Sequence, residues 1–207
     1  YSNLSEHSAM PGLTERHYSL AFVVLASVTR LCSAGPDNNY QTDYETFELP
    51  GHGEITMQVP RVWNYNFTWN DETQPPVITF YVLDREEEEI FQLNMSFLWD
   101  DGYERNVTEP DYIRSLVEET GQALLPLSDE EDLLLEDIRG QQGQGYLFDL
   151  SDSSAGSGEY KYLTQGALSV RDVLLIFSLF SNDDSALLRD AMLNTIKSAK
   201  HHFRNDV

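Results

Sequence analysis

The segment from Val173 to Phe180 is the feature that most constrains what this chain can fold into. Every residue in it except Ser178 is apolar, and a short apolar run bounded by polar residues is typical of a β-strand buried on both faces. A second strand-like segment, Tyr160 to Val170, precedes it across the polar pair Arg171-Asp172. The pattern predicts a β-hairpin whose second strand must be covered by other elements on each side.

Earlier parts of the chain supply more strands. Gly53 to Pro60 alternates apolar and polar side chains, which predicts a strand exposed on one face. Val77 to Leu83 and Ile90 to Trp99 predict an antiparallel hairpin, and the glutamates at its tip, residues 86 to 89, are interpreted as solvated charge. Further strands are expected at residues 62 to 70, where aromatic residues alternate, and at residues 132 to 138 and 145 to 150.

Two helices are expected. Thr108 is predicted to cap the first helix, with Pro110 in its first turn and its end near Leu125. Apolar residues at helical spacing predict a final helix from a cap at residues 182 to 185 to about Phe203, with basic residues in its last turns. This order of elements indicates an α+β domain, an antiparallel sheet packed by helices.

The charge balance limits the partners that the chain can have. The 207 residues include 35 acidic and 13 basic side chains, which give a net charge of −22. A field of this sign repels nucleic acid and anionic lipid surfaces, so neither is expected as a partner. The one cysteine, Cys32, excludes an intramolecular disulfide bond and a cysteine-based zinc site.

The N-terminal region resembles a secretory signal peptide. An apolar run from Tyr18 to Val28 is followed by small residues before a predicted cleavage after Ala34, with Met10 as the expected initiator. The run is too short for a membrane-spanning helix, which needs about 20 residues. Export as a lipoprotein, with Cys32 as the lipidated residue, is less favoured, because the preceding Thr29-Arg30-Leu31 lacks the small residues that such sites need. The alternative to export is that these residues form a buried N-terminal helix.

These assignments divide the chain into three parts. Residues 1–34 are predicted to be an N-terminal extension and signal peptide, residues 35–46 a linker, and residues 47–204 a single globular domain. The expected location is extracytoplasmic, in the periplasm or secreted.

No catalytic, cofactor-binding or metal-ligating set of residues is predicted, and no cofactor is expected. His52 lies in a glycine-rich turn, which favours a structural role, and the adjacent His201 and His202 are predicted to be cations at a helix end. Trp99-Asp100-Asp101-Gly102 lacks the ligand spacing of a calcium loop. The Ser- and Gly-rich loop at residues 151–158 is where a binding site is expected if the chain has one.

Two motifs resemble those of a known family. The strand at Gly53 to Trp63, which ends in Pro-Arg-Val-Trp, resembles the opening strand of PsbP-like domains. The ending that starts at Tyr160-Lys-Tyr-Leu-Thr-Gln-Gly166 is similar to that of a group of uncharacterised exported bacterial proteins. The resemblance covers the chain from about Phe47 to Phe203 and implies an α/β/α sandwich around an antiparallel sheet. It carries over no functional residue, because PsbP-like domains bind and assemble varied partners.

The leading hypothesis is an exported, non-enzymatic domain that binds a protein partner or assists assembly in the bacterial cell envelope. One alternative is an extracytoplasmic hydrolase that uses acidic residues near the aromatic strand between Trp63 and Trp69. A concave pocket that joins those aromatic residues to carboxyl groups of raised pKa would favour the hydrolase. The other alternative is a calcium-responsive module.

Overall fold

The structure, a computed structural model, describes residues 41–69, 75–83, 89–100, 106–184 and 186–203. These residues lie in one compact unit. In chain order their elements are β1 (Thr42–Leu49), β2 (Gly53–Pro60), β3 (Asn64–Thr68), β4 (Val77–Leu83), β5 (Glu89–Trp99), α1 (Pro110–Leu124), the 3-10 turn η1 (Leu125–Leu127), β6 (Glu136–Arg139), β7 (Gln144–Ser151), β8 (Tyr162–Val170), β9 (Val173–Ser181), α2 (Ala186–Ser198) and β10 (Lys200–His202). In this part of the chain, no helix is long and apolar enough to cross a lipid bilayer.

The described strands form two antiparallel sheets. The larger sheet has seven strands in the order β3-β4-β5-β9-β8-β7-β6, and the smaller has three in the order β1-β2-β10. The predicted hairpin is confirmed as β8 and β9, which pair from Tyr162 opposite Ser181 to Val170 opposite Val173. Strand β9 also pairs with β5 along its whole length, so it lies at the centre of the large sheet.

Both faces of β9 are buried, as its apolar run predicts. Val173, Leu175, Phe177 and Leu179 join the larger core, which lies between the large sheet, α2 and the small sheet. Leu174 and Ile176 point to the opposite face and join a second core with Ile113 and Val117 of α1. Alternation of side chains along a strand therefore divides one apolar run between two cores.

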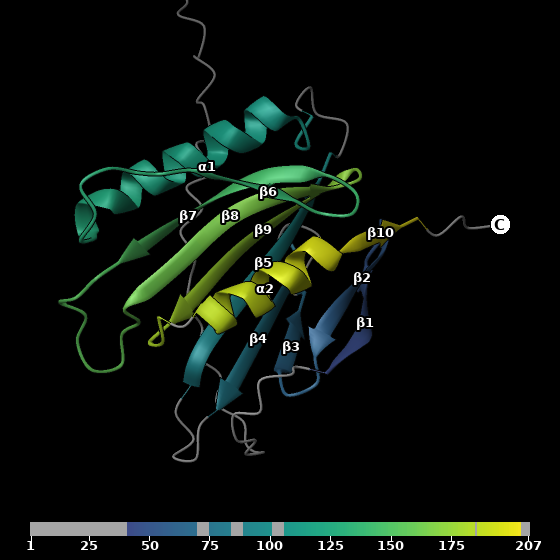
Figure 1. Cartoon of the computed structure of the whole chain (residues 1–207). Helices are drawn as coiled ribbons and strands as arrows, with labels where there is room; N and C mark the ends of the chain where they lie inside the picture. Colours follow the sequence, from purple (N-terminus) through teal and green to yellow (C-terminus); the bar gives the residue numbers. More distant parts are fainter. Residues whose placement is uncertain (1–40, 70–74, 84–88, 101–105, 185, 204–207) are drawn as a thin grey trace, which may run out of the picture. The chain divides into compact units, whose positions relative to one another are not determined.

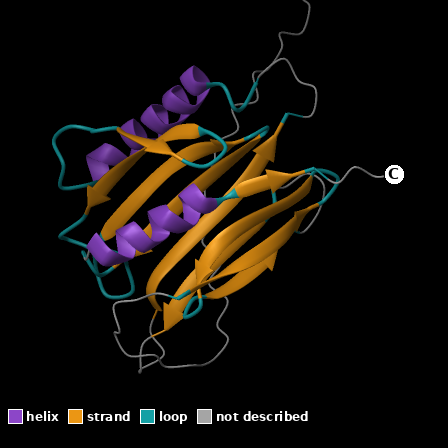
Figure 2. Ribbon diagram, turned by 45° about the vertical axis from the view of Figure 1, so that its right-hand side comes forward, coloured by secondary structure: helices purple, strands orange, loops and turns teal. Residues whose placement is uncertain are grey.

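These two cores define a layered arrangement. Helix α1 covers one face of the large sheet, over β7 and β8, and α2 lies with the small sheet on the other face (Figures 1 and 2). The α+β class and the predicted α/β/α sandwich are confirmed, with the small sheet as an addition to one outer layer. The alternating strand at residues 53–60 is also confirmed, because Ile55, Met57 and Val59 are buried in the larger core.

A glycine explains part of the motif that ends at Gly166. Gly166 lies opposite Phe177 in β9 and opposite Leu147 in β7. A Cβ atom at Gly166 would lie 2.7 Å from Phe177 Cζ and 2.7 Å from Leu147 Cβ. Glycine is therefore needed at position 166 for β7, β8 and β9 to pack this closely.

Several boundaries differ from the sequence prediction. The strand expected at residues 132 to 138 is shorter, with β6 at Glu136–Arg139. Strand β1 begins at Thr42, within the segment predicted as linker, whereas residues 1–40 lie outside the described residues. The N-cap of α1 is Glu109, without a side-chain hydrogen bond, and Thr108, predicted as the cap, lies one residue earlier with its hydroxyl donating to Asn106 Oδ1 at 2.7 Å. The last helix ends at Ser198, and residues 200–202 form β10.

The histidines of β10 correct the prediction of helix-end cations. His201 is fully buried and His202 is exposed, because β10 pairs with β2 and its side chains alternate between two faces. The ring of His201 lies between two oxygen acceptors: Nδ1 is 2.8 Å from Asp172 Oδ1 and Nε2 is 2.5 Å from the His52 carbonyl oxygen. Both ring nitrogens therefore have an oxygen partner, and His201 joins β10 to the β1–β2 and β8–β9 turns.

We expect His201→Ala to lower the free energy of unfolding by about 2–4 kcal/mol, because it opens a cavity at a fully buried side chain and removes the hydrogen bonds to Asp172 and to the His52 carbonyl. The matched control is the exposed neighbour, and His202→Ala should change the free energy by less than about 0.5 kcal/mol. Urea denaturation followed by circular dichroism measures both. Equal effects of the two substitutions would contradict the anchoring role of His201.

Candidate functional site

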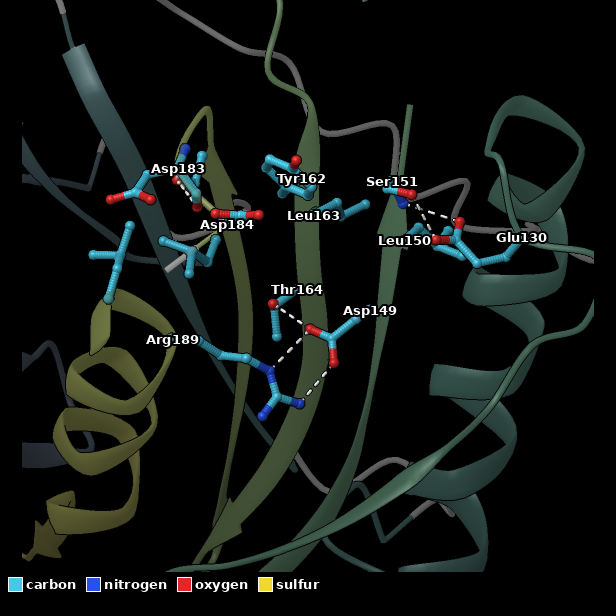
Figure 3. Close-up of a pocket in the computed structure, with 13 residues that line it drawn as sticks. Glu130, Asp149, Leu150, Ser151, Tyr162, Leu163, Thr164, Asp183, Asp184 and Arg189 are labelled. Carbon is cyan, nitrogen blue, oxygen red and sulfur yellow. Dashed lines mark hydrogen bonds and ion pairs between the residues drawn. The ribbon is translucent and has the colours of Figure 1, made fainter. Parts of the chain in front are cut away.

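An open pocket of about 350 Å³ lies at one corner of the large sheet, beside the N-terminal end of α2 (Figure 3). Helix α2 begins close after the end of β9 and runs to the β6–β7 turn, where the Gln141 N–H donates to the Lys197 carbonyl at 3.1 Å. This diagonal course leaves the end of β7 and the start of β8 uncovered. The pocket is lined by Glu130, Asp149, Leu150, Ser151, Tyr162, Leu163, Thr164, Leu179, Ser181, Asp183, Asp184, Leu188 and Arg189.

An ion pair between Arg189 of α2 and Asp149 of β7 forms one wall. The guanidinium is bidentate: Nε lies 3.1 Å from Asp149 Oδ1 and Nη2 lies 2.6 Å from Oδ2. The same Nη2 is 2.9 Å from Glu136 Oε2 in β6. Hydrogen bonding to Asp149 raises the pKa of Arg189 well above its usual value, although partial burial opposes the shift.

The position of Asp149 is set by the pairing of β7 with β8. Thr164 lies directly opposite Asp149 in that register, and its hydroxyl donates to Asp149 Oδ1. Because Thr164 is buried and packed in a central strand, it holds the carboxylate in the orientation that the guanidinium needs. Paired charge-assisted bonds of this kind give a rigid geometry.

A second carboxylate, Glu130, is held on the opposite side of the pocket. Its two oxygens accept hydrogen bonds from Ser151, one from the backbone N–H at 2.9 Å and one from the hydroxyl at 2.7 Å. Burial alone would raise the pKa of Glu130, but donation from Ser151 and Ser128 outweighs it and lowers the pKa below its usual value. Glu130 therefore stays ionised over a wider pH range than a free glutamate.

The charge of the pocket is acidic. Glu130, Asp149, Asp183 and Asp184 supply four carboxylates against the single guanidinium of Arg189, which is already paired. Asp183 and Asp184 are exposed and lie in the short connection between β9 and α2. Four leucines provide the apolar part of the lining, so the site offers carboxylates next to an apolar surface.

A smaller pocket of about 160 Å³ adjoins this one. It shares Leu150, Ser151, Tyr162 and Leu163 with the first pocket and extends to Tyr160 and η1. The two pockets therefore share part of their lining at the end of β7 and the start of β8.

The residues that the sequence suggested for metal binding or catalysis lie outside this pocket. His52 stacks on Trp99 with ring centroids 4.0 Å apart, and His201 is buried at the opposite end of the sheet from the pocket. Residues 101–105, which include part of the calcium-like turn, are outside the described residues. Among the described residues, no group of three or more His, Cys, Asp or Glu is placed to hold a metal ion.

Sequence reasoning missed the pocket residues apart from the expectation of binding at residues 151–158. Ser151 does line the pocket, at the first position of that loop. Arg189 and Asp149 are separated by 40 positions, and no motif connects them. The sequence gives one sign of a polar site here, because Asp149 interrupts the apolar residues of the strand at 145 to 150.

Comparison with known proteins gives structural neighbours only. No protein-family model and no curated protein sequence matches the chain. The solution structure of cyanobacterial PsbP (CyanoP) from Synechocystis sp. PCC 6803 is similar with a TM-score of 0.45 and 13% identity, over 83% of this chain and 99% of that one. A crystal structure from Bacteroides thetaiotaomicron VPI-5482 is similar with a TM-score of 0.34 and 10% identity, over 73% of this chain and 46% of that one.

The lowered pKa of Glu130 predicts an effect on stability in acid. A carboxyl group whose pKa is lower in the folded protein than its ordinary value of 4.5 stabilises the fold above that pH, and this contribution is lost as pH falls through the folded pKa. We therefore expect Glu130→Gln to reduce the loss of stability below about pH 4.5. Urea denaturation across this range measures it, with the exposed neighbour substituted as Glu131→Gln for control. Identical pH profiles for Glu130→Gln and the wild type would contradict the prediction.

Proposed function

We propose that this protein is an exported, non-enzymatic binding or assembly domain of the bacterial cell envelope, and that the pocket beside α2 receives a basic segment of a partner protein. The observation that carries the proposal is the combination of an acidic lining with leucine side chains around a single, already neutralised arginine. A lysine or arginine side chain has the matching form, because it carries an apolar stem and a charged end.

The carboxylates of the pocket are held in place before any partner arrives. Asp149 is fixed by Arg189 and Thr164, and Glu130 by Ser151. A rigid site loses little side-chain entropy on binding, which favours recognition. Asp183 and Asp184 at the exposed side add negative potential, which attracts a basic segment during the encounter.

The same contacts give no support to the hydrolase alternative. A general acid at neutral pH needs a raised pKa, whereas among the described residues the pKa values of the carboxyl groups of Glu130 and Asp152 are both shifted downward. The pKa of Asp152 is lowered because its carboxylate accepts hydrogen bonds from the Ser154 hydroxyl and backbone N–H. Trp63 of the aromatic stretch is buried in the core, and β3 contributes no residue to the pockets described above.

The binding proposal is tested with a lysine-containing probe. A short fluorescein-labelled peptide in which lysine is flanked by leucine is titrated with the protein, and fluorescence polarisation gives the affinity. We expect Asp184→Lys to weaken binding about tenfold, because it replaces attraction with repulsion at the pocket. A counterpart peptide with glutamate in place of lysine should not bind.

The matched control is Glu118→Lys, which makes the same change of net charge on the exposed face of α1. Its effect should be less than about twofold, because exposed charges farther apart than the Debye length are screened. Equal losses for the two variants would mean that the peptide is attracted by the overall charge alone, which would refute the pocket as the site.

Export is tested separately by expression in a Gram-negative bacterium with residues 10–34 intact. The proposal expects the protein in the periplasm with Gly35 as its first residue, as determined by mass spectrometry. Cys32→Ser should leave this result unchanged, because simple cleavage does not use the thiol. Retention in the cytoplasm would overturn the proposed location.

A further inference from the structure

The four edge strands of the two sheets differ in their charge. Edge strands expose unpaired backbone groups, and charged side chains commonly protect them from unwanted pairing. β1 carries three acidic residues, β6 carries Glu136, Asp137 and Arg139, and β10 carries Lys200. β3 has the sequence Asn-Tyr-Asn-Phe-Thr and no charge. In a chain whose charged residues make up 23% of the total, β3 is the edge without this protection.

The backbone of β3 is open along one side. Among the described residues β3 pairs only with β4, from Asn64 opposite Tyr81 to Thr68 opposite Val77. All five of its residues are exposed. Among the described residues no strand pairs with the other side of β3, the side to which an added strand would donate and accept backbone hydrogen bonds; Figure 1 shows β3 beside β4.

A row of aromatic side chains lies next to this edge. Tyr65 and Phe67 alternate in β3, so they lie on the same face, and Trp69 follows directly after the last residue of the strand; the three are 43%, 40% and 38% exposed. Phe47 of β1 supports the row from below, with ring centroids 5.2 Å from Tyr65 and 6.3 Å from Phe67. Half-exposed rings on a buried support are typical of residues that anchor a partner.

One carboxylate is placed within the aromatic row. Glu45 of β1 accepts a hydrogen bond of 3.4 Å from the Tyr65 hydroxyl. Partial burial and the negative charge of Glu45 both raise the pKa of Tyr65. Glu45 thus adds negative potential where apolar side chains of an added strand would lie.

We propose that β3 is a docking edge for an extended segment of a partner protein, which adds as a strand and brings apolar side chains to the aromatic row and a lysine or arginine to Glu45. Charge complementarity selects such a partner over a second copy of this chain. Two copies would repel each other, because each has a net charge of −22. Pairing through β3 would also bring the Glu45 carboxylates of both copies to one interface, and β3 has no basic residue to balance them.

This surface is independent of the pocket beside α2, since the two share no residue. Failure of one site in an experiment therefore leaves the other untouched. A domain with two separate recognition surfaces can hold two segments, which suits an assembly role.

The test uses a short fluorescein-labelled peptide of alternating valine and threonine that ends in arginine on both sides. We expect it to bind the wild type, and a counterpart that ends in glutamate not to bind. Phe67→Lys should weaken binding at least about tenfold, because it puts a cation on the edge. Asp184→Lys should have little effect, since it changes only the pocket. Glu45→Gln should reduce the preference for arginine-ended over glutamate-ended peptide.

The matched control is Leu134→Lys, which introduces the same charge at a side chain that is 77% exposed and away from β3. Circular dichroism confirms that each variant is folded. Amide hydrogen exchange at residues 64–68 should slow when the peptide binds, because strand pairing protects backbone amides. The proposal is wrong if exchange there does not change, if Phe67→Lys and Leu134→Lys have equal effects, or if the wild type self-associates through β3 and Phe67→Lys abolishes this.

Discussion

Burial of β9 on both faces is the constraint from which the rest of the structure follows. Its side chains alternate between two cores, with Phe177 on one side of the sheet and Ile176 on the other. A strand of this kind is stable only with hydrogen-bonded neighbours and an apolar layer over each face. β5 and β8 supply the neighbours, α1 supplies one layer, and α2 supplies the other together with the small sheet.

The candidate binding pocket is a consequence of how that second layer is built. A helix is about 10 Å wide and neighbouring strands are about 4.8 Å apart, so α2 can cover only about two strands at any level. It runs diagonally from the end of β9 to the turn at Gln141. The uncovered corner needs polar side chains, and Asp149, Thr164 and Arg189 occupy it with hydrogen bonds to one another.

Sequence patterns predicted the strands and the first helix well because their periods are local properties. The alternation of Ile55, Met57 and Val59 indicated an inward face that the structure confirms. The prediction was wrong at the C-terminal end, where the helical stripe was extended to Phe203. There β10 gains backbone hydrogen bonds to β2 and buries His201, and a pairing partner more than a hundred residues away has no local pattern.

The sequence alone determined that this chain is an acidic α+β domain with a doubly buried strand at its centre, because apolar periodicity and charge are properties of consecutive residues. The tertiary structure decided which polar residues meet. Arg189 reaches Asp149 only because α2 lies across the sheet, and β3 becomes an open edge only because strand order places it last in the sheet. Long-range packing sets both, and it cannot be deduced from residue spacing.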